Sequence, residues 1–452
     1  MNEPSASETL VIIGNGIAGI TCARHVRKRS RRPVVVISSE TDYFFSRTAL
    51  MYIYMGHMKF EHTKPYEDHF WAKNNITLVR NHVQQINTAN RELLFADGTR
   101  MFYGDLVLAT GSRSNFFGWP GQDLKGVQGL YSYTDLQRME ADTQGIAKAV
   151  VVGGGLIGVE MAEMLHARGI HVTFLVREND FWCNVLPAEE AALISRHLRE
   201  HGIDLRLNTE LKELLPDSNG RVRAAVTTQG EEIACQFAGI AVGVSPNAEM
   251  ARQSGVACER GILVNEFFET DQPHVYAIGD CAQYRTPPPG RRAIEPLWYT
   301  GRFHGETLAL TLTGKRTAYA PGAWFNSAKF FDIEYQTYGE VKANAGANES
   351  SFYWQHASGK ISFRAVYDAA SKRLIGINVF GMRLRHELVD RWLREGVNVA
   401  HAIENLASAN FDPEFYKPFE KEIATAFTAQ TGIHVLSKAK SWTHIFKRPQ
   451  HT

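Results

Sequence analysis

Two segments of the chain repeat one pattern of strand, glycine-rich turn, helix and second strand, which restricts the folds open to it. The first segment has an apolar strand at 10–13, a helix to about Ser30 and a buried strand at 34–37. The second has a strand at 149–152, a helix at 159–167 and a strand at 171–176. Because such units build parallel sheets covered by helices, the sequence predicts an α/β fold with two doubly wound domains.

Each repeat carries its glycines where a bound diphosphate would need them. The turns read Gly14-Asn15-Gly16-Ile17-Ala18-Gly19 and Gly153-Gly154-Gly155-Leu156-Ile157-Gly158. The first glycine allows a tight turn, the second lets the backbone approach a pyrophosphate, and the third lets the helix pack on the strand. Phosphates would then lie at the helix N-terminus, where free N–H groups favour an anion. Glu40 follows about 20 residues after the first turn, where a carboxylate can hold ribose hydroxyls.

Three further segments, at 105–113, 243–247 and 275–280, follow in an order that supports a resemblance. Together with the two turns, they resemble the FAD-containing pyridine-nucleotide-disulfide oxidoreductase family over roughly residues 8–320. The resemblance implies a glutathione-reductase-like architecture of two Rossmann-like domains. We expect an FAD-binding domain at 1–117 and 241–320, with an NAD(P)-binding domain at 118–240 inserted in it. An α+β C-terminal domain at 321–430 and a basic tail at 431–452 would follow.

The same resemblance implies the residues that contact each cofactor. For FAD they are Gly14, Gly16, Ile17, Ala18, Gly19, Ser39, Glu40, Arg47, Val83, Ala109, Thr110, Gly111, Gly279, Asp280, Leu297 and Trp298. For the nicotinamide cofactor they are Gly153, Gly155, Leu156, Ile157, Gly158, Glu160, Arg177 and Gly243.

The end of the 171–176 strand bears on the choice between NADPH and NADH. Relatives that use NADH usually have an acid where Val176 stands, and here Arg177 follows instead. An arginine can pair with a 2′-phosphate, so the sequence favours NADPH slightly over NADH. Glu178 weakens this preference, and a solvated Arg177–Glu178 edge is the alternative.

A second resemblance concerns the flavin surroundings. Glu295-Pro296-Leu297-Trp298 resembles the Glu-x-x-Trp segment of ferredoxin and rubredoxin reductases, and a helix beginning near Leu297 would direct its positive end at the flavin. The 43–52 segment keeps the arginine of those reductases as Arg47, but Tyr52 replaces their lysine. No catalytic residue is certain, since the chemistry would centre on the flavin; the candidates are Tyr52, Glu160, Glu295 and Trp298.

The cysteines argue against dithiol chemistry. Cys22, Cys183, Cys235, Cys258 and Cys281 are scattered, and none lies near Arg47, where disulfide reductases of the family place a pair. The C-terminal His-Pro pair of those enzymes is also missing from the matching stretch at 407–413. Since thiol–disulfide exchange needs these groups, we exclude a glutathione-reductase-like reaction.

Composition excludes other classes. A net charge of +1 argues against nucleic-acid binding, and no run of about 18 apolar residues predicts a transmembrane helix. The N-terminus has no signal-peptide pattern and the cysteines suit a reducing compartment, so we expect a cytoplasmic protein.

His197-Leu198-Arg199-Glu200-His201 matches an inverted zinc-protease pattern, but a helix covering a sheet is expected there, so we predict no metal.

These inferences converge on an FAD-dependent NAD(P)H oxidoreductase that passes electrons to a ferredoxin-like iron–sulfur carrier. The alternatives are a reductase of quinones or other diffusible acceptors and a signalling flavoprotein resembling apoptosis-inducing factor. The third domain makes a homodimer possible, and the basic tail is either a docking segment or a packing arm.

Overall fold

The computed structural model describes residues 8–411 and 417–438. Two compact units divide the chain, and each is described by itself. The first unit comprises Met1–Arg177 and Thr209–Pro321, and the second comprises Glu178–Asn208 and Gly322–Thr452.

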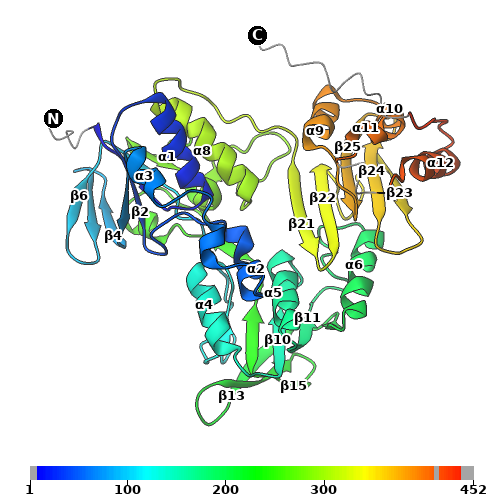
Figure 1. The fold of residues 1–452 in the computed structure, drawn as a ribbon, viewed down its shortest axis with the longest axis horizontal. Helices are drawn as coiled ribbons and strands as arrows, with labels where there is room; N and C mark the ends of the chain where they lie inside the picture. Colours follow the sequence, from blue (N-terminus) through cyan, green and yellow to red (C-terminus); the bar gives the residue numbers. More distant parts are fainter. Residues whose placement is uncertain (1–7, 412–416, 439–452) are drawn as a thin grey trace. The chain divides into compact units, whose positions relative to one another are not determined.

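A parallel sheet forms the first half of the first unit. Its order is β19 (Val275–Ala277), β7 (Asp105–Leu108), β1 (Leu10–Ile13), β2 (Val34–Ser38) and β3 (Ile76–Arg80). Every neighbouring pair is parallel. All four residues of β1 are buried, as expected of a strand covered on both faces. Helices α1 (Ile17–Arg29) and α8 (Trp298–Leu312) pack side by side against this sheet (Figure 1).

A second parallel arrangement repeats the first within the same unit. Strand β10 (Lys148–Val152) lies between β11 (His171–Leu175) and β16 (Phe237–Ile240), and β16 also pairs with β9 (Val127–Gln128). Helix α5 (Leu156–Ala167) links β10 to β11. Both expected strand–turn–helix–strand units are therefore confirmed, and so is the α/β fold class.

Short elements complete the first unit, and several were not expected from the sequence. Two antiparallel sheets are formed by β4 (Val83–Asn87), β5 (Glu92–Phe95) and β6 (Arg100–Phe102), and by β13 (Leu211–Pro216), β14 (Val222–Thr227) and β15 (Glu232–Ala234). Strand β8 (Ser112–Ser114) pairs with β17 (Val244–Pro246), and β18 (Ile262–Val264) pairs with β20 (Ala282–Tyr284). The short helices are α2 (Leu50–Tyr54), α3 (His69–Lys73), α4 (Tyr133–Asp142) and α7 (Glu249–Gln253).

The second unit is built on an antiparallel sheet, as predicted for an α+β domain. Its order is β21 (Phe325–Phe330), β22 (Ile333–Gly339), β25 (Leu374–Phe380), β24 (Ser362–Asp368) and β23 (Glu349–Gln355). One face packs against α9 (His386–Glu395), α10 (Val399–Glu404), α11 (Leu406–Ala409) and α12 (Glu420–Thr431). Phe363, Ala365 and Tyr367 belong to this core and alternate with residues on the opposite face, because strand side chains alternate.

Helix α6 (Ala188–Glu200) supplies polar partners to that opposite face. The buried carboxylate of Glu190 accepts hydrogen bonds from Arg364 of β24 (3.0 Å) and Asn378 of β25 (2.9 Å). Residues 178–208 thus belong to the same compact unit as the C-terminal sheet. The domain boundaries inferred from the resemblance, which assign these residues to the NAD(P)-binding domain, remain a prediction.

Candidate dinucleotide-binding site

The two glycine turns have the same backbone geometry. Gly14 and Gly153 adopt φ values of +115° and +114°, which L side chains rarely adopt. A Cβ on Gly19 would lie 2.1 Å from the carbonyl oxygen of Gly14, and one on Gly158 would lie 2.2 Å from that of Gly153. The first and third glycines of each turn therefore meet steric requirements that the spacing had predicted.

The middle glycines face open space. Gly16 and Gly155 are the N-caps of α1 and α5, and neither helix start has a side-chain cap. A Cβ at either position would meet nothing within 4 Å. Uncapped N–H groups beside open space at a helix N-terminus suit a diphosphate.

A cavity of about 850 Å³ lies beside the first turn, within the first unit. This volume falls in the range of roughly 300–1,000 Å³ that is typical of ligand sites. All predicted FAD residues except Gly19 line it, namely Gly14, Gly16, Ile17, Ala18, Ser39, Glu40, Arg47, Val83, Ala109, Thr110, Gly111, Gly279, Asp280, Leu297 and Trp298. Residues that lie as far apart in the sequence as Gly14 and Trp298 therefore line the same cavity.

The predicted nicotinamide residues divide into two groups. Ile157 and Glu160, from the first turns of α5, lie on the cavity wall. Gly153, Gly155, Leu156, Gly158, Arg177 and Gly243 do not line this cavity. The cavity thus receives residues from both glycine-turn helices, α1 and α5.

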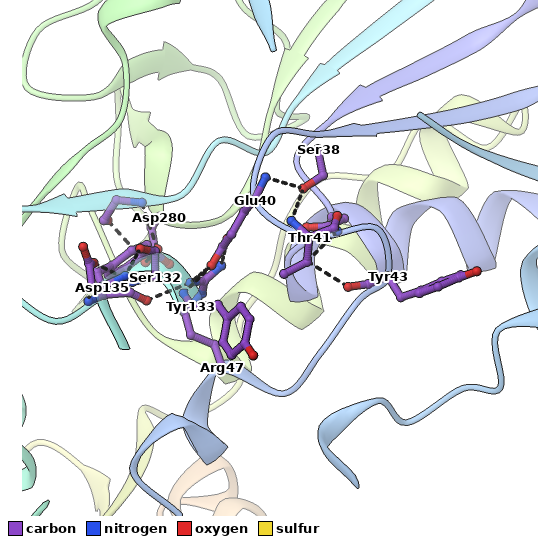
Figure 2. A network of polar contacts seen from close by, with 12 residues as sticks. Ser38, Glu40, Thr41, Tyr43, Arg47, Ser132, Tyr133, Asp135 and Asp280 are labelled. Carbon is purple, nitrogen blue, oxygen red and sulfur yellow. Dashed lines mark hydrogen bonds and ion pairs between the residues drawn. The ribbon is translucent and has the colours of Figure 1, made fainter. Parts of the chain in front are cut away.

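An ion pair fixes the predicted ribose carboxylate. Arg47 donates from Nη1 to Oε1 of Glu40 (2.9 Å) and from Nη2 to Oε2 (2.6 Å), as Figure 2 shows. The backbone N–H of Tyr133 also donates to Oε1 (2.7 Å). Arg47 in turn donates to the backbone oxygen of Tyr131 (2.7 Å). The carboxylate is held in one orientation, and Oε2, which accepts one hydrogen bond where Oε1 accepts two, keeps a lone pair for a ribose hydroxyl.

Asp280 is anchored by two hydroxyl groups that were not among the predicted site residues. Tyr131 donates to its Oδ2 over 3.1 Å and Ser112 over 3.3 Å. Burial raises the pKa of Asp280, and the two hydrogen bonds partly oppose that shift. Tyr131 lies 149 residues from Asp280, so no local pattern could have revealed the contact.

The residues of the Glu-x-x-Trp segment differ in their position relative to the cavity. Leu297 and Trp298 line the cavity, and the N-terminus of α8 begins between them without a side-chain cap. Glu295 does not line it; its buried carboxylate binds Arg291 through two hydrogen bonds of 2.6 and 2.7 Å. Tyr52 also lies outside the lining, with its ring stacked on His57.

Helix α8 is positioned by close contact with α1. A Cβ on Gly305 would lie 2.5 Å from the Ala18 carbonyl oxygen, so only glycine allows this approach. The preceding residue, His304, accepts a hydrogen bond at Nδ1 from the Gly279 N–H (3.1 Å), and its Nε2 lies 2.6 Å from the Tyr284 hydroxyl. Burial lowers the pKa of His304 to about 3, so the ring stays neutral and holds the Gly279 turn.

Glu160 is a second carboxyl group on the cavity wall whose pKa is raised. Burial, and then the charge of Glu163, raise the pKa of Glu160 to about 7. Such a shift is typical of functional sites, although structural carboxyl pairs also produce it. Glu160 can therefore change its charge near neutral pH beside a bound cofactor.

The five cysteines form no disulfide. Cys22, Cys235 and Cys281 are buried, and burial raises the pKa of Cys22 and of Cys235 to about 12. Thiols of this kind are poor nucleophiles. Asp412 and Pro413, which stand where other members of the family have a His-Pro pair, lie outside the described residues. The tail from residue 439 lies outside them as well.

The fold and the site define an α/β protein in which helices from two dinucleotide-type turns contribute to one cavity. The model of the pyridine nucleotide-disulphide oxidoreductase family matches residues 8–304. The chain belongs to this family, and membership implies FAD and a pyridine nucleotide as cofactors. The uncapped helix starts, the open space at Gly16 and the cavity beside it fit such a cofactor pair.

Named relatives support an electron-transfer branch of the family. The chain is 27% identical over 394 residues to the assimilatory nitrate reductase electron transfer subunit of Bacillus subtilis (strain 168), covering 86% of this chain and 49% of the relative. It is 29% identical over 290 residues to the biphenyl dioxygenase system ferredoxin–NAD(+) reductase component of Paraburkholderia xenovorans (strain LB400), covering 64% and 71%. The chain therefore spans about half the length of the first of these relatives.

A solved structure supports the fold. The crystal structure of a ferredoxin reductase from Rhodopseudomonas palustris matches with a TM-score of 0.76 at 24% identity, covering 83% of this chain and 91% of that one.

Among the described residues, no helix combines the length and apolar character needed to cross a bilayer.

Proposed function

We propose that this chain is an NAD(P)H-dependent flavoprotein reductase that passes electrons to a small iron–sulfur carrier. One observation carries the proposal: a single cavity is lined both by the α1 turn, which suits FAD, and by Ile157 and Glu160 of α5, which follow the second turn. Two dinucleotides bound in this way would bring their reactive rings together.

The chain's own residues would bind and orient the cofactors. We assign the first glycine turn, Glu40 and Asp280 to FAD, and the second turn with Glu160 to the nicotinamide cofactor. FAD would supply the ability to accept a hydride and release electrons singly. The N-terminus of α8 would place its positive end beside the cavity at Leu297 and favour negative charge there.

The acceptor is proposed from the cysteines and the relatives. None of the five cysteines is paired in a disulfide, and three of them are buried, so we propose that electrons leave directly from the flavin. Relatives are named as an electron transfer subunit and a ferredoxin–NAD(+) reductase component, which favours an iron–sulfur carrier over a diffusible quinone.

Anaerobic stopped-flow reduction tests the first half of the proposal. The flavin absorbance of the purified holoprotein should bleach on mixing with NADPH or NADH. Reduced protein should then reduce a [2Fe–2S] ferredoxin faster than a soluble quinone. Bleaching with quinone turnover only would favour the diffusible-acceptor reductase, and a flavin that no nucleotide reduces would favour a signalling flavoprotein.

For the nicotinamide cofactor we propose NADPH. Val176 is buried and offers no carboxylate to repel a 2′-phosphate, and Arg177 is exposed at the adjacent position. The R177A variant should lose kcat/KM for NADPH while keeping that for NADH. An equal loss for both nucleotides, or none, would contradict this preference.

A further inference from the structure

The His-x-x-Glu-His segment of α6 meets a carboxylate that is distant in sequence. His197 and His201 lie one helical turn apart, and Asp332 stands in the two-residue turn between β21 and β22. One ligand atom from each of the three residues lies within 4.8 Å of the others. Within residues 8–411 and 417–438, no other group of three histidines, cysteines or carboxylates comes this close. All three residues belong to the second unit.

We propose that His197, His201 and Asp332 bind one Zn²⁺ ion that ties α6 to the β21–β22 hairpin. Two imidazoles and a carboxylate are a usual protein ligand set for zinc, and solvent would take the fourth position. None of these three residues lines the dinucleotide cavity, and the proposal does not depend on the proposed reductase activity.

The imidazole of His197 is buried without a satisfactory hydrogen bond. Its side chain is 2% exposed, and neither ring nitrogen has a hydrogen-bond partner of acceptable geometry. The contact between its Nε2 and Oδ1 of Asp332 is short, at 2.7 Å, but lacks the direction of a hydrogen bond. A buried polar ring without such a partner is costly, and a metal ion would satisfy it.

The imidazole of His201 is oriented by a contact at its Nδ1. Its Nδ1 lies 3.0 Å from the backbone oxygen of His197, which suits an Nδ1–H donor. That tautomer leaves Nε2 free as an acceptor, 3.4 Å from Oδ1 of Asp332. Metal-binding histidines are usually oriented by such a hydrogen bond from the other ring nitrogen.

Distances around Oδ1 of Asp332 are close to those of a tetrahedral site. Zinc bonds of about 2.0–2.2 Å separate neighbouring ligand atoms by roughly 3.3 Å. The His201 contact of 3.4 Å already fits, and the His197 contact of 2.7 Å has to widen. Asp332 is half exposed in a hairpin turn, which allows this adjustment.

Lys360 is the competing charge in the cluster. Its Nζ lies 2.8 Å from Oδ2 of Asp332, whereas both histidines contact Oδ1. A carboxylate can ligate a metal through Oδ1 while its second oxygen accepts a hydrogen bond, which orients the ligand. Lys360 is therefore compatible with the site and would help to hold Asp332.

The test is a zinc titration of chelator-treated holoprotein against a chromophoric competitor. We expect one tight equivalent per chain. The H201Q and D332N variants should each weaken this binding by at least about tenfold, because even outer partners of zinc ligands contribute that much. Both positions are partly exposed, so the variants should fold, which flavin content and circular dichroism will verify.

The matched control is H356Q, which removes a histidine of the same unit that contacts Ser358 and lies outside the cluster. Its affinity should equal that of the wild type. Co²⁺ substitution of the wild type gives an independent readout: a tetrahedral d–d spectrum supports the site even if a variant fails to fold. Absence of a tight equivalent in the wild type, or equal affinity in H201Q and D332N, would overturn the proposal.

Discussion

Arg47 and Glu40 form a two-point ion pair on the wall of the cavity, with Nη–Oε distances of 2.9 and 2.6 Å. Both residues were predicted FAD contacts, but the resemblance did not indicate that they bind each other. If both residues contact FAD as predicted, Arg47 would act on the cofactor partly by holding Glu40 in place. Removing the guanidinium should affect FAD through the carboxylate as well as directly.

We expect the R47M variant to bind FAD roughly ten- to a hundredfold more weakly. Loss of a charged hydrogen-bond partner costs about 1–3 kcal/mol, and each 1.4 kcal/mol is a factor of ten. Fluorescence of released FAD at equilibrium measures the effect. R80M is the control, because Arg80 is exposed and its ion pair with Asp42 is long, at 3.8 Å. Equal FAD affinity in R47M and R80M would show that the ion pair does not support the site.

Glu160 should make the stability of the protein depend on pH. Its pKa is raised to about 7 in the folded protein from an ordinary value of 4.5, so the folded state binds more protons between these values. Stability is then complete below about pH 4.5 and is lost as pH rises through about 7, by at most about 3 kcal/mol. The partly exposed side chain reduces this figure.

The E160Q variant should remove that pH dependence. Its melting temperature should exceed that of the wild type above pH 7 and approach it near pH 5. E67Q, at an exposed position, should follow the wild type throughout. Parallel melting curves for E160Q and wild type across this range would contradict the raised pKa.

The pair between Arg291 and Glu295 predicts a stability effect next to α8. Glu295 is fully buried, so R291M would leave its carboxylate without a cation, at a cost of about 3–5 kcal/mol. Chemical denaturation measures this loss. R292M replaces an exposed neighbour and should have little effect. If both variants unfold at the same denaturant concentration, the buried pair does not stabilise this segment.

The sequence predicted elements whose signals are local. The strand β1 and the helix α1 follow from an apolar run, a glycine turn and helical periodicity, and the same signals located β10 and α5. The family order of motifs then placed distant segments such as Asp280 on the same cavity as Gly14. Each of these motifs is a short run of neighbouring residues, so it can be recognised in the sequence alone.

Contacts between distant side chains could not be predicted in this way. Tyr131 reaches Asp280 over 149 residues of sequence, and Glu190 of α6 reaches Asn378 over 188. No periodicity or spacing encodes such pairs, because they depend on how elements pack. The same holds for Asp332, which converts a helical histidine pair into a candidate metal cluster.

The middle glycines provide a matched pair of variants. A Cβ at Gly16 or at Gly155 meets nothing within 4 Å, so G16A and G155A should both fold. Each added methyl group would occupy the space where one diphosphate approaches the backbone. The two variants should therefore lose different cofactors.

The assignment of FAD to the first turn and the nicotinamide cofactor to the second is tested by anaerobic reduction of G155A with NADPH and NADH, followed through flavin absorbance, together with the flavin content of G16A. We expect G155A to retain FAD but to be reduced at least about tenfold more slowly, a loss of about 1.4 kcal/mol, and G16A to be purified without flavin. Wild-type reduction rates in G155A, or full flavin content in G16A, would contradict the assignment of one dinucleotide to each turn.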